Sequence, residues 1–312
     1  TVYLPLDTNK NVNKFLDIIN PEMAFFVKYE FWPNYLKSLY KRNTPTYLIS
    51  GVFRESHWFF KFYGFWMRKV LRSFTHFFVQ NNSSKEILCK FNINNCSVMG
   101  DSRYDRVMEL LNENNEVPFL KDFKNNKICI VAGSTWKEDN DLIIKFINSC
   151  ASTNTCWIIA PHQINLKYIK ELQNKIELNS ILLSELNFEN FKNINLIIVD
   201  SIGQLTKLYS YADISYVGGG MGTSGLHNTL EPAVHKIPII IGKNFKNFPE
   251  VSELINLNGI KTVNNFDSFE TEIIELIQSN DKRNKMGEIN FEYIKRNLGA
   301  SDKVISYLNE IK

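Results

Sequence analysis

A glycine-rich stretch at residues 213–232 carries the strongest chemical signal in the chain. It reads DISYVGGGMGTSGLHNTLEP, an apolar run at residues 214–217 followed by a loop with five glycines. Glycine lets a backbone approach a ligand closely, and the first turn of a helix presents unpaired N–H groups that favour an anion. Asn228 is placed to cap such a helix, and Glu231 falls in its first turn, where a carboxylate accepts from a sugar diol.

This pattern is typical of half of a nucleotide-sugar pocket. The candidate nucleotide-binding residues of the segment are Gly218, Gly219, Gly220, Gly225, Asn228 and Glu231. The alternative interpretation is a Gly-rich turn followed by a helix cap, with no ligand.

The elements that must position these residues read as strands alternating with helices, which predicts parallel β/α units. In the second half of the chain, we expect strands at residues 128–132, 157–160, 181–183, 196–199, 214–217 and 238–241. Ligands of such sheets bind beyond the carboxyl ends of the strands. Polar or small residues follow four of these strands, and they add Ser134, Thr135 and His162 to the candidate nucleotide-binding residues.

Each of these additions has a simpler explanation. Thr135 and Glu138 have the spacing of a capping box, which alone accounts for both. His162 follows Pro161 at a strand end, and a lone histidine there is equally consistent with an ordinary surface position. His227 is ambiguous in the same way.

The first half of the chain predicts a second β/α series. Strands are expected at residues 24–27, 46–49, 77–80 and 96–99, with helices at 12–19 and 34–41. A polar stretch at 110–126 suggests a linker. We therefore predict an N-terminal domain at 1–109, a linker at 110–126 and a C-terminal domain at 127–312, whose tail forms helices broken near Gly299. A ligand is expected in a cleft between the two domains.

Composition narrows the function classes. The chain has 312 residues, a net charge of +3 and 44% hydrophobic residues, so it is globular and carries no charge excess that implies nucleic acid. Its five cysteines lack C-x-x-C spacing, which favours reduced thiols in a cytoplasmic protein and gives no zinc site. No cofactor is expected. The sequence contains no run of about 18 apolar residues, so no membrane span is predicted.

Residues 53–78 interleave aromatic and basic side chains. Trp58, Phe62, Phe65 and Trp66 alternate with Lys61, Arg68, Lys69 and Arg72 among others. Such a mixture suits an anionic membrane surface. The alternative is a helix that packs half of its aromatics into a core, and stacking on single-stranded nucleic acid is the least favoured interpretation.

The ordered motifs resemble those of 3-deoxy-D-manno-octulosonic acid (Kdo) transferases. The matching pieces are Glu30-Phe31-Trp32-Pro33-Asn34, residues 98–105 (VMGDSRYD), residues 132–135 (AGST), residues 200–205 (DSIGQL), residues 218–233 and Asn247-Phe248. Each piece is weak, whereas their order over nearly the whole chain is specific.

The resemblance implies an α/β protein of GT-B fold, with two doubly wound Rossmann-like domains that face a cleft. It implies transfer of Kdo from CMP-Kdo to a lipid A precursor in lipopolysaccharide synthesis, with inversion and without a metal. The location implied is the cytoplasmic face of the bacterial inner membrane. The glycine loop and Ser134–Thr135 would hold the phosphate of CMP, and Glu231 its ribose.

Three positions depart from the family pattern. Pro161 stands where an arginine is common, Leu226 replaces a glycine, and Gln204 replaces a glutamate. The chain also begins at Thr1 without the family's membrane anchor and acceptor loop, so we expect an incomplete first domain. The catalytic base is then expected upstream of Thr1, with Glu30 in a supporting role and little transfer by this chain alone.

Two alternatives stay open. The first is another GT-B nucleotide-sugar transferase, or an epimerase that uses a uridine nucleotide. The second is a non-catalytic fragment that binds only nucleotide or membrane.

Overall fold

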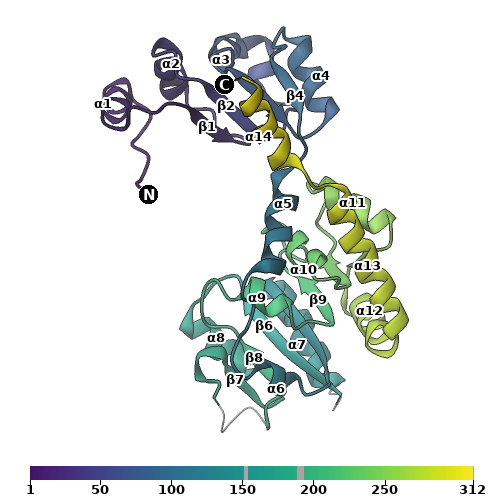
Figure 1. The fold of residues 1–312 in the computed structure, drawn as a ribbon. Helices are drawn as coiled ribbons and strands as arrows, with labels where there is room; N and C mark the ends of the chain where they lie inside the picture. Colours follow the sequence, from purple (N-terminus) through teal and green to yellow (C-terminus); the bar gives the residue numbers. More distant parts are fainter. Residues whose placement is uncertain (151–153, 188–192, 312) are drawn as a thin grey trace. The chain divides into compact units, whose positions relative to one another are not determined.

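The computed structural model describes residues 1–150, 154–187 and 193–311, and it divides into two compact α/β units (Figure 1). The first unit comprises residues 1–105 and 297–312, and the second comprises residues 106–296. Each unit contains one sheet, and every strand pair in both sheets is parallel. Lys312, the end of the predicted tail, lies outside the described residues.

The first unit contains a four-stranded sheet in the order β1-β2-β3-β4. Its strands are β1 (Ala24–Val27), β2 (Thr46–Gly51), β3 (His76–Val79) and β4 (Cys96–Val98). Its helices are α1 (Asn9–Ile19), α2 (Pro33–Lys41), η1 (Trp58–Phe60), η2 (Phe62–Gly64), α3 (Phe65–Leu71), α4 (Asn82–Lys90) and α14 (Ala300–Glu310), while α5 (Ser102–Glu109) runs from this unit into the second. All four predicted strands are present.

Alternation along the strands separates two apolar layers in this unit. Leu48 and Phe77 point into a cluster with residues of α2, α3 and α4. Their neighbours Tyr47 and Phe78 point to the opposite face, where they pack against Ala300 of α14 and its neighbours. The last helix of the chain therefore completes the core of the first unit (Figure 1).

Polar contacts fix α14 in the same place. The Asp105 carboxylate accepts hydrogen bonds from the backbone N–H of Gly299 at 2.8 Å and of Ser301 at 2.7 Å, so it caps the start of the helix. The hydroxyl of Tyr307 lies 3.2 Å from Nδ1 of His76 on β3. The predicted C-terminal domain at 127–312 is therefore wrong for its last helix, which belongs to the first unit.

The aromatic stretch of the first unit divides its side chains between core and surface. Phe59 and Phe60 are buried, whereas Phe62 is 90% exposed and Tyr63, Phe65 and Trp66 are also exposed. Arg68 is not free, because its guanidinium donates to the carbonyls of Phe59 and Lys61, both at 2.8 Å. Half of the aromatics thus pack in the core, as the simpler interpretation expects, and the other half stay at the surface.

The second unit contains a seven-stranded sheet in the order β11-β10-β9-β5-β6-β8-β7. Its strands are β5 (Ile128–Thr135), β6 (Thr155–Pro161), β7 (Ser180–Leu182), β8 (Leu196–Ile198), β9 (Ile214–Val217), β10 (Ile239–Gly242) and β11 (Ile260–Val263). Its helices are η3 (Leu110–Asn112), α6 (Leu120–Lys124), α7 (Lys137–Ser149), α8 (Leu166–Asn174), η4 (Leu183–Glu185), α9 (Leu205–Tyr209), α10 (Leu230–Val234), α11 (Pro249–Asn256), α12 (Phe266–Gln278) and α13 (Asn280–Arg296). The six predicted strands are present, and β11 is additional.

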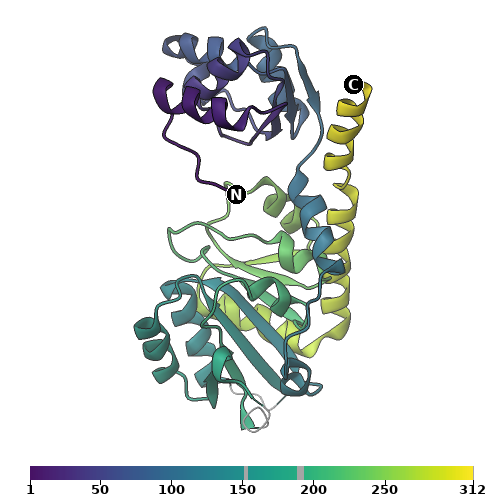
Figure 2. The same ribbon diagram turned by 60° about the vertical axis from the view of Figure 1, so that its left-hand side comes forward.

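Helices cover both faces of this sheet (Figures 1 and 2). One layer buries residues of α7, α8 and α12, and the other buries residues of α6 and α9. The predicted linker at 110–126 is part of the second layer, because Leu120 and Phe123 are buried there and Lys124 pairs with Asp213 at 2.8 Å. It does not behave as a free connector.

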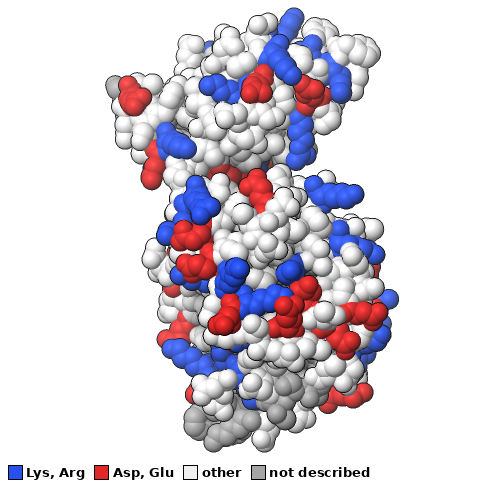
Figure 3. Space-filling model, turned by 90° about the vertical axis from the view of Figure 1, so that its right-hand side faces the viewer, with Lys and Arg blue, Asp and Glu red and all other residues white. Residues whose placement is uncertain are grey.

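The outer face of α12 and α13 carries charges of both signs. Figure 3 shows Lys and Arg interleaved with Asp and Glu over this part of the second unit. Lys236 pairs with Glu288 at 3.0 Å, and Lys295 pairs with Glu292 at 2.9 Å. This face has no single-sign field of the kind that attracts nucleic acid.

Candidate functional site

The candidate site lies where the strand order of the second unit reverses. Strand β5 pairs with β6 on one side and with β9 on the other, so consecutive segments of the chain diverge at this point. Loops that leave two such strands separate and form a crevice for a ligand. Ser134 at the end of β5 and Gly218 directly after β9 both lie at this crevice.

The glycines of the loop are required by close backbone packing. A Cβ atom at Gly218 would lie 2.4 Å from the carbonyl oxygen of Ser134, and one at Gly220 would lie 2.9 Å from the backbone nitrogen of Gly242. Gly219 has φ +89°, and a Cβ there would lie 2.1 Å from the carbonyl oxygen of Gly225. These contacts hold the ends of β5, β9 and β10 together, which is a structural role.

Asp139, a residue that the sequence reasoning missed, connects the loops of the site. It is fully buried in α7, and its carboxylate accepts from the hydroxyl of Tyr216 at 2.7 Å and from the backbone N–H of Gly219 at 2.8 Å. It also accepts from the backbone N–H of Trp136 at 2.9 Å. A single carboxylate thus holds the start of α7 against the glycine loop.

The predicted capping box is displaced by one residue. Helix α7 begins at Lys137 with Trp136 as its N-cap, so the acidic residue at the third helical position is Asp139 and not Glu138. Thr135 is the last residue of β5 and is 1% exposed, and its hydroxyl is buried without a hydrogen-bond partner in the described part of the chain. Its carbonyl accepts from the backbone N–H of His162 at 2.9 Å, which ties the loop after β6 to the site.

Two backbone donors of the glycine loop are already in use. The N–H of Gly218 donates to the carbonyl of Gly133 at 2.9 Å, and the N–H of Gly219 donates to Asp139. An anion at this loop must therefore be bound by donors from Gly220 onward or by Ser134, which has a left-handed backbone with φ +53°.

The ring of His162 packs on both Trp136 and His227 beside the glycine loop, and the rings of Trp136 and His227 lie 6.5 Å apart and nearly parallel. The Trp136 and His162 rings lie 4.6 Å apart with 24° between their planes, and the His162 and His227 rings lie 4.4 Å apart. Nε1 of Trp136 donates to Nε2 of His227 at 3.0 Å, which requires His227 to be neutral. Burial, with His162 as a second cause, lowers the pKa of His227 and favours that state.

Asn228 and Glu231 occupy the start of α10. Oδ1 of Asn228 accepts from the backbone N–H of Leu230 at 3.1 Å, and its Nδ2 donates to Glu231 at 3.0 Å. Glu231 falls in the first turn, as expected, although Thr229 and not Asn228 is the N-cap residue. Burial raises the pKa of Glu231. Its carboxylate is therefore poorly solvated and gains from donors supplied by a ligand.

In the first unit, Glu30 is exposed and accepts a hydrogen bond from Nε1 of Trp32 at 2.7 Å.

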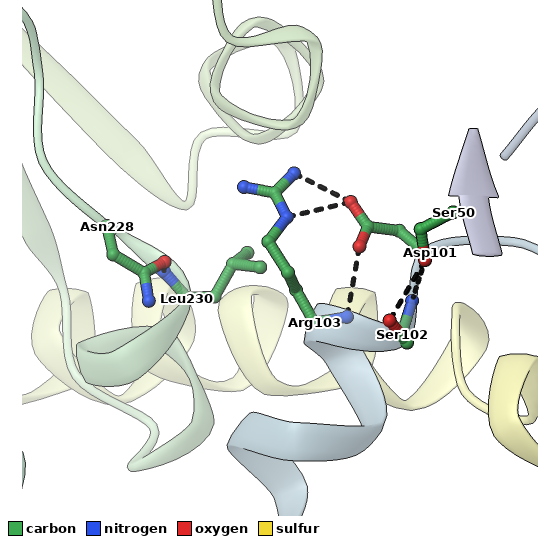
Figure 4. A network of polar contacts seen from close by, with 6 residues as sticks. All are labelled: Ser50, Asp101, Ser102, Arg103, Asn228 and Leu230. Atoms are coloured by element: carbon green, nitrogen blue, oxygen red, sulfur yellow. Dashed lines mark hydrogen bonds and ion pairs between the residues drawn. The ribbon is translucent and has the colours of Figure 1, made fainter. Parts of the chain in front are cut away.

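A cluster of polar side chains follows β4 in the first unit (Figure 4). The Asp101 carboxylate accepts from Nε of Arg103 at 2.8 Å, and the hydroxyls of Ser50 and Ser102 lie 2.9 Å apart. Together with the helix cap by Asp105, these contacts explain why residues 101–105 carry so many polar side chains.

The fold places the chain in a structural class. The UDP-GlcNAc 2-epimerase of Neisseria meningitidis, solved with UDP-GlcNAc, matches 97% of this chain and 81% of its own with a TM-score of 0.65 at 16% identity. The C-terminal CMP-Kdo binding domain of WaaA from Acinetobacter baumannii matches with a TM-score of 0.50 at 18% identity, over 62% of this chain and 98% of that domain. The predicted GT-B fold is confirmed.

Sequence similarity identifies the family that the chain resembles. Residues 1–106 match the model of the 3-deoxy-D-manno-octulosonic-acid transferase (kdotransferase) family. The 3-deoxy-D-manno-octulosonic acid transferase of Haemophilus influenzae is 27% identical over 98% of this chain. A bifunctional glycosyltransferase/methyltransferase of Fusobacterium nucleatum is 28% identical over 79% of this chain. The predicted resemblance is confirmed, and the chain is homologous to glycosyltransferases.

The chain spans different shares of its relatives. It covers 73% of the Haemophilus influenzae protein, 39% of the Fusobacterium nucleatum protein and 52% of the Rickettsia prowazekii Kdo transferase. Within the described residues, no helix is both long and apolar enough to cross a bilayer. In the same part of the chain, no three His, Cys, Asp or Glu side chains are placed to hold a metal ion.

Proposed function

We propose that the protein transfers Kdo from CMP-Kdo to a lipid A precursor, with inversion at the anomeric carbon and without a metal. The observation that carries this proposal is the continuous similarity to a curated Kdo transferase over 98% of the chain. The likeness of the second unit's fold to a CMP-Kdo binding domain supports the choice of donor.

CMP would bind at the strand-order reversal of the second unit. Backbone donors from Gly220 onward and the Ser134 turn would stabilise the charge that develops on the leaving phosphate. The Glu231 carboxylate would accept hydrogen bonds from the ribose hydroxyls, and the exposed ring of His162 would contact the ligand. These residues are among those that the sequence suggested. Gly218 and Gly219, whose N–H groups already donate within the protein, shape the loop, and Thr135 contributes only its backbone.

The reaction would be a direct displacement. The acceptor hydroxyl attacks the anomeric carbon of Kdo, the bond to the CMP phosphate breaks, and a carboxylate base takes the hydroxyl proton. Glu30 is exposed in the first unit and would support that base, which we do not assign to a residue of this chain.

The acceptor implies work at a membrane, which we propose to be the cytoplasmic face of the bacterial inner membrane. Phe62, Tyr63, Phe65 and Trp66 expose apolar area, and Lys69 and Arg72 supply positive charge beside them. Aromatic and basic side chains together favour the interface of an anionic bilayer.

Calorimetry with CMP and UDP tests the donor. We expect CMP to bind at least tenfold more tightly than UDP, a difference of about 1.4 kcal/mol. Preference for UDP would instead favour an epimerase or another transferase, in line with the fold shared with UDP-GlcNAc 2-epimerase. Single-turnover transfer from fresh CMP-Kdo to a lipid A precursor then distinguishes an enzyme from a protein that only binds nucleotide.

A further inference from the structure

A positively charged pocket adjoins the glycine loop of the second unit. It has a volume of about 400 Å³, and Gly222, Gly225, Lys243, Asn244, Lys246 and Asn247 contribute to its lining. One wall is the loop after β9, and the other is the loop after β10. Both loops leave the carboxyl edge of the sheet, the edge at which nucleotide ligands bind.

The two loops hold each other in place. The backbone N–H of Asn244 donates to the carbonyl of Gly220 at 2.9 Å, and its side-chain Nδ2 donates to the carbonyl of Gly222 at 2.7 Å. Gly242 packs so closely on Gly220 that a Cβ there would lie 2.2 Å from the Gly220 carbonyl carbon. The backbone that carries the lysines is therefore positioned by the donor site itself.

The charge of this pocket is not neutralised within the described part of the second unit. Lys243 and Lys246 are exposed and take part in none of its ion pairs, whereas Lys236, Lys282 and Lys295 are all paired with glutamates. No carboxylate lines the pocket. The Glu138 carboxylate packs against Gly222 at its border, with its carbon 2.9 Å from the position of a Cβ on that glycine.

We propose that Lys243 and Lys246 bind the carboxylate of an acidic sugar on the donor nucleotide. This inference rests on the proposed function, in which the single phosphate of a CMP donor lies at Ser134 and the glycine loop. A CMP-linked 2-keto sugar acid carries a carboxylate, and with it a second negative charge, on the anomeric carbon that is joined to that phosphate through an oxygen. The lysine pocket shares Gly222 and Gly225 with the phosphate loop, so both charges are met by neighbouring parts of one loop. The two lysines thereby distinguish sugar acids from neutral sugars.

The test compares three ligands by calorimetry: CMP, CDP and freshly prepared CMP-Kdo without acceptor. The variant carries Lys243→Gln and Lys246→Gln. Its matched control carries Lys261→Gln and Lys285→Gln, which remove the same charge from a second lysine-lined pocket beside β11 and α13. Because charge-assisted hydrogen bonds are strong, we expect the variant to bind CMP-Kdo about tenfold more weakly than the parent. Its affinity for CMP should change less than about twofold. The control should match the parent for all three ligands.

The outcomes separate this inference from the proposed function. The parent may bind CMP-Kdo no more tightly than CMP, or the variant may lose affinity for both ligands equally. In either case the lysine pocket is not a carboxylate site, and the CMP assignment stands. If the parent binds CDP more tightly than CMP but binds CMP-Kdo no more tightly than CMP, the pocket binds a second phosphate and the carboxylate assignment is overturned. Absence of CMP binding in the folded parent would overturn the donor assignment and this inference together.

Discussion

Asp139 in α7 accepts a hydrogen bond at 2.8 Å from the backbone N–H of Gly219, a residue that lies eighty positions further along the chain. The same buried carboxylate binds Tyr216 and the N-cap of its own helix. The shape of the glycine loop therefore depends on a charged group that itself does not face the crevice.

The Asp139→Asn substitution tests this dependence. The amide has the shape of the carboxylate but lacks its charge and turns a donor toward one of its partners. Because hydrogen bonds to a charged group contribute about 1.5–3 kcal/mol each, we expect a loss of about 2–3 kcal/mol in the free energy of unfolding, measured in urea. Asp141→Asn, at an exposed position of the same helix, is the control. Equal stability of the two variants would contradict the role of Asp139.

Gly219 and Gly225 distinguish backbone strain from collision. Both have positive φ, but a Cβ at Gly225 meets nothing within 4 Å, whereas one at Gly219 meets the Gly225 carbonyl. Gly225→Ala should cost about 1 kcal/mol from its left-handed conformation. Gly219→Ala should cost about 1–3 kcal/mol more because the loop must move to relieve the overlap. Thermal unfolding of the two variants measures the difference, and similar melting temperatures would show that the loop yields freely.

Glu231→Gln should lower CMP affinity by about tenfold or more, because a charged acceptor for the ribose hydroxyls becomes neutral. Burial raises the pKa of Glu231, so the carboxyl group gains its proton at a higher pH than an ordinary glutamate. CMP affinity of the parent should therefore fall as the pH is lowered through that raised pKa, and affinity of the variant should not. The stability of the unliganded protein depends on pH in the opposite direction, because the raised pKa contributes stability that is lost as the pH rises through it. Calorimetric titration over a pH series with parent and variant checks the first statement.

His227 gives a second pH dependence, of stability. Its lowered pKa reflects burial, and the neutral ring accepts from Trp136. A group with a lowered pKa contributes stability that is complete above its ordinary pKa of 6.5 and is lost as the pH falls through the folded value. His227→Gln supplies an acceptor that does not titrate. The parent should lose more stability than this variant between neutral and mildly acidic pH in urea unfolding, and parallel losses would show that His227 does not contribute.

The surface aromatics of the first unit should bind anionic vesicles. Replacing Lys61, Lys69 and Arg72 by Gln should weaken binding, since each basic residue near such a surface contributes about 1 kcal/mol. Arg68 is left unchanged because it holds the carbonyls of Phe59 and Lys61, and its loss would disturb the fold. Co-sedimentation at low salt with vesicles of anionic or neutral lipid measures the effect. Sedimentation of the triple variant equal to that of the parent would leave the surface without a membrane role.

Local patterns in the sequence predicted the strands and the loops of the site. Apolar runs such as residues 214–217 are buried on both faces and are therefore easy to recognise. Strand β11 was not predicted, because only two of its four residues are apolar. Lys261 and Thr262 are half-buried at the edge of the sheet. Polar edge strands resemble loops in composition.

The remaining errors concern contacts between distant parts of the chain. The capping box was predicted one residue too early because Glu138 and Asp139 are both acidic, and only the partner at Gly219 decides between them. The position of α14 had no local signal, because an apolar helix face does not specify which sheet it covers. Its attachment depends on Asp105, nearly two hundred residues earlier. Such pairings become visible only in the folded chain.

The position of α14 also makes the first unit discontinuous, with the entire second unit inserted between residues 105 and 297. While the second unit is folded, it holds these two ends of the chain at a fixed separation. When it unfolds, α14 is tethered by a long flexible loop, and closing such a loop costs conformational entropy. Damage confined to the second unit will therefore weaken the docking of α14 on Tyr47 and Phe78. We expect a protease cut or a destabilising mutation in the second unit to lower the stability of both units, although the first unit itself is unchanged.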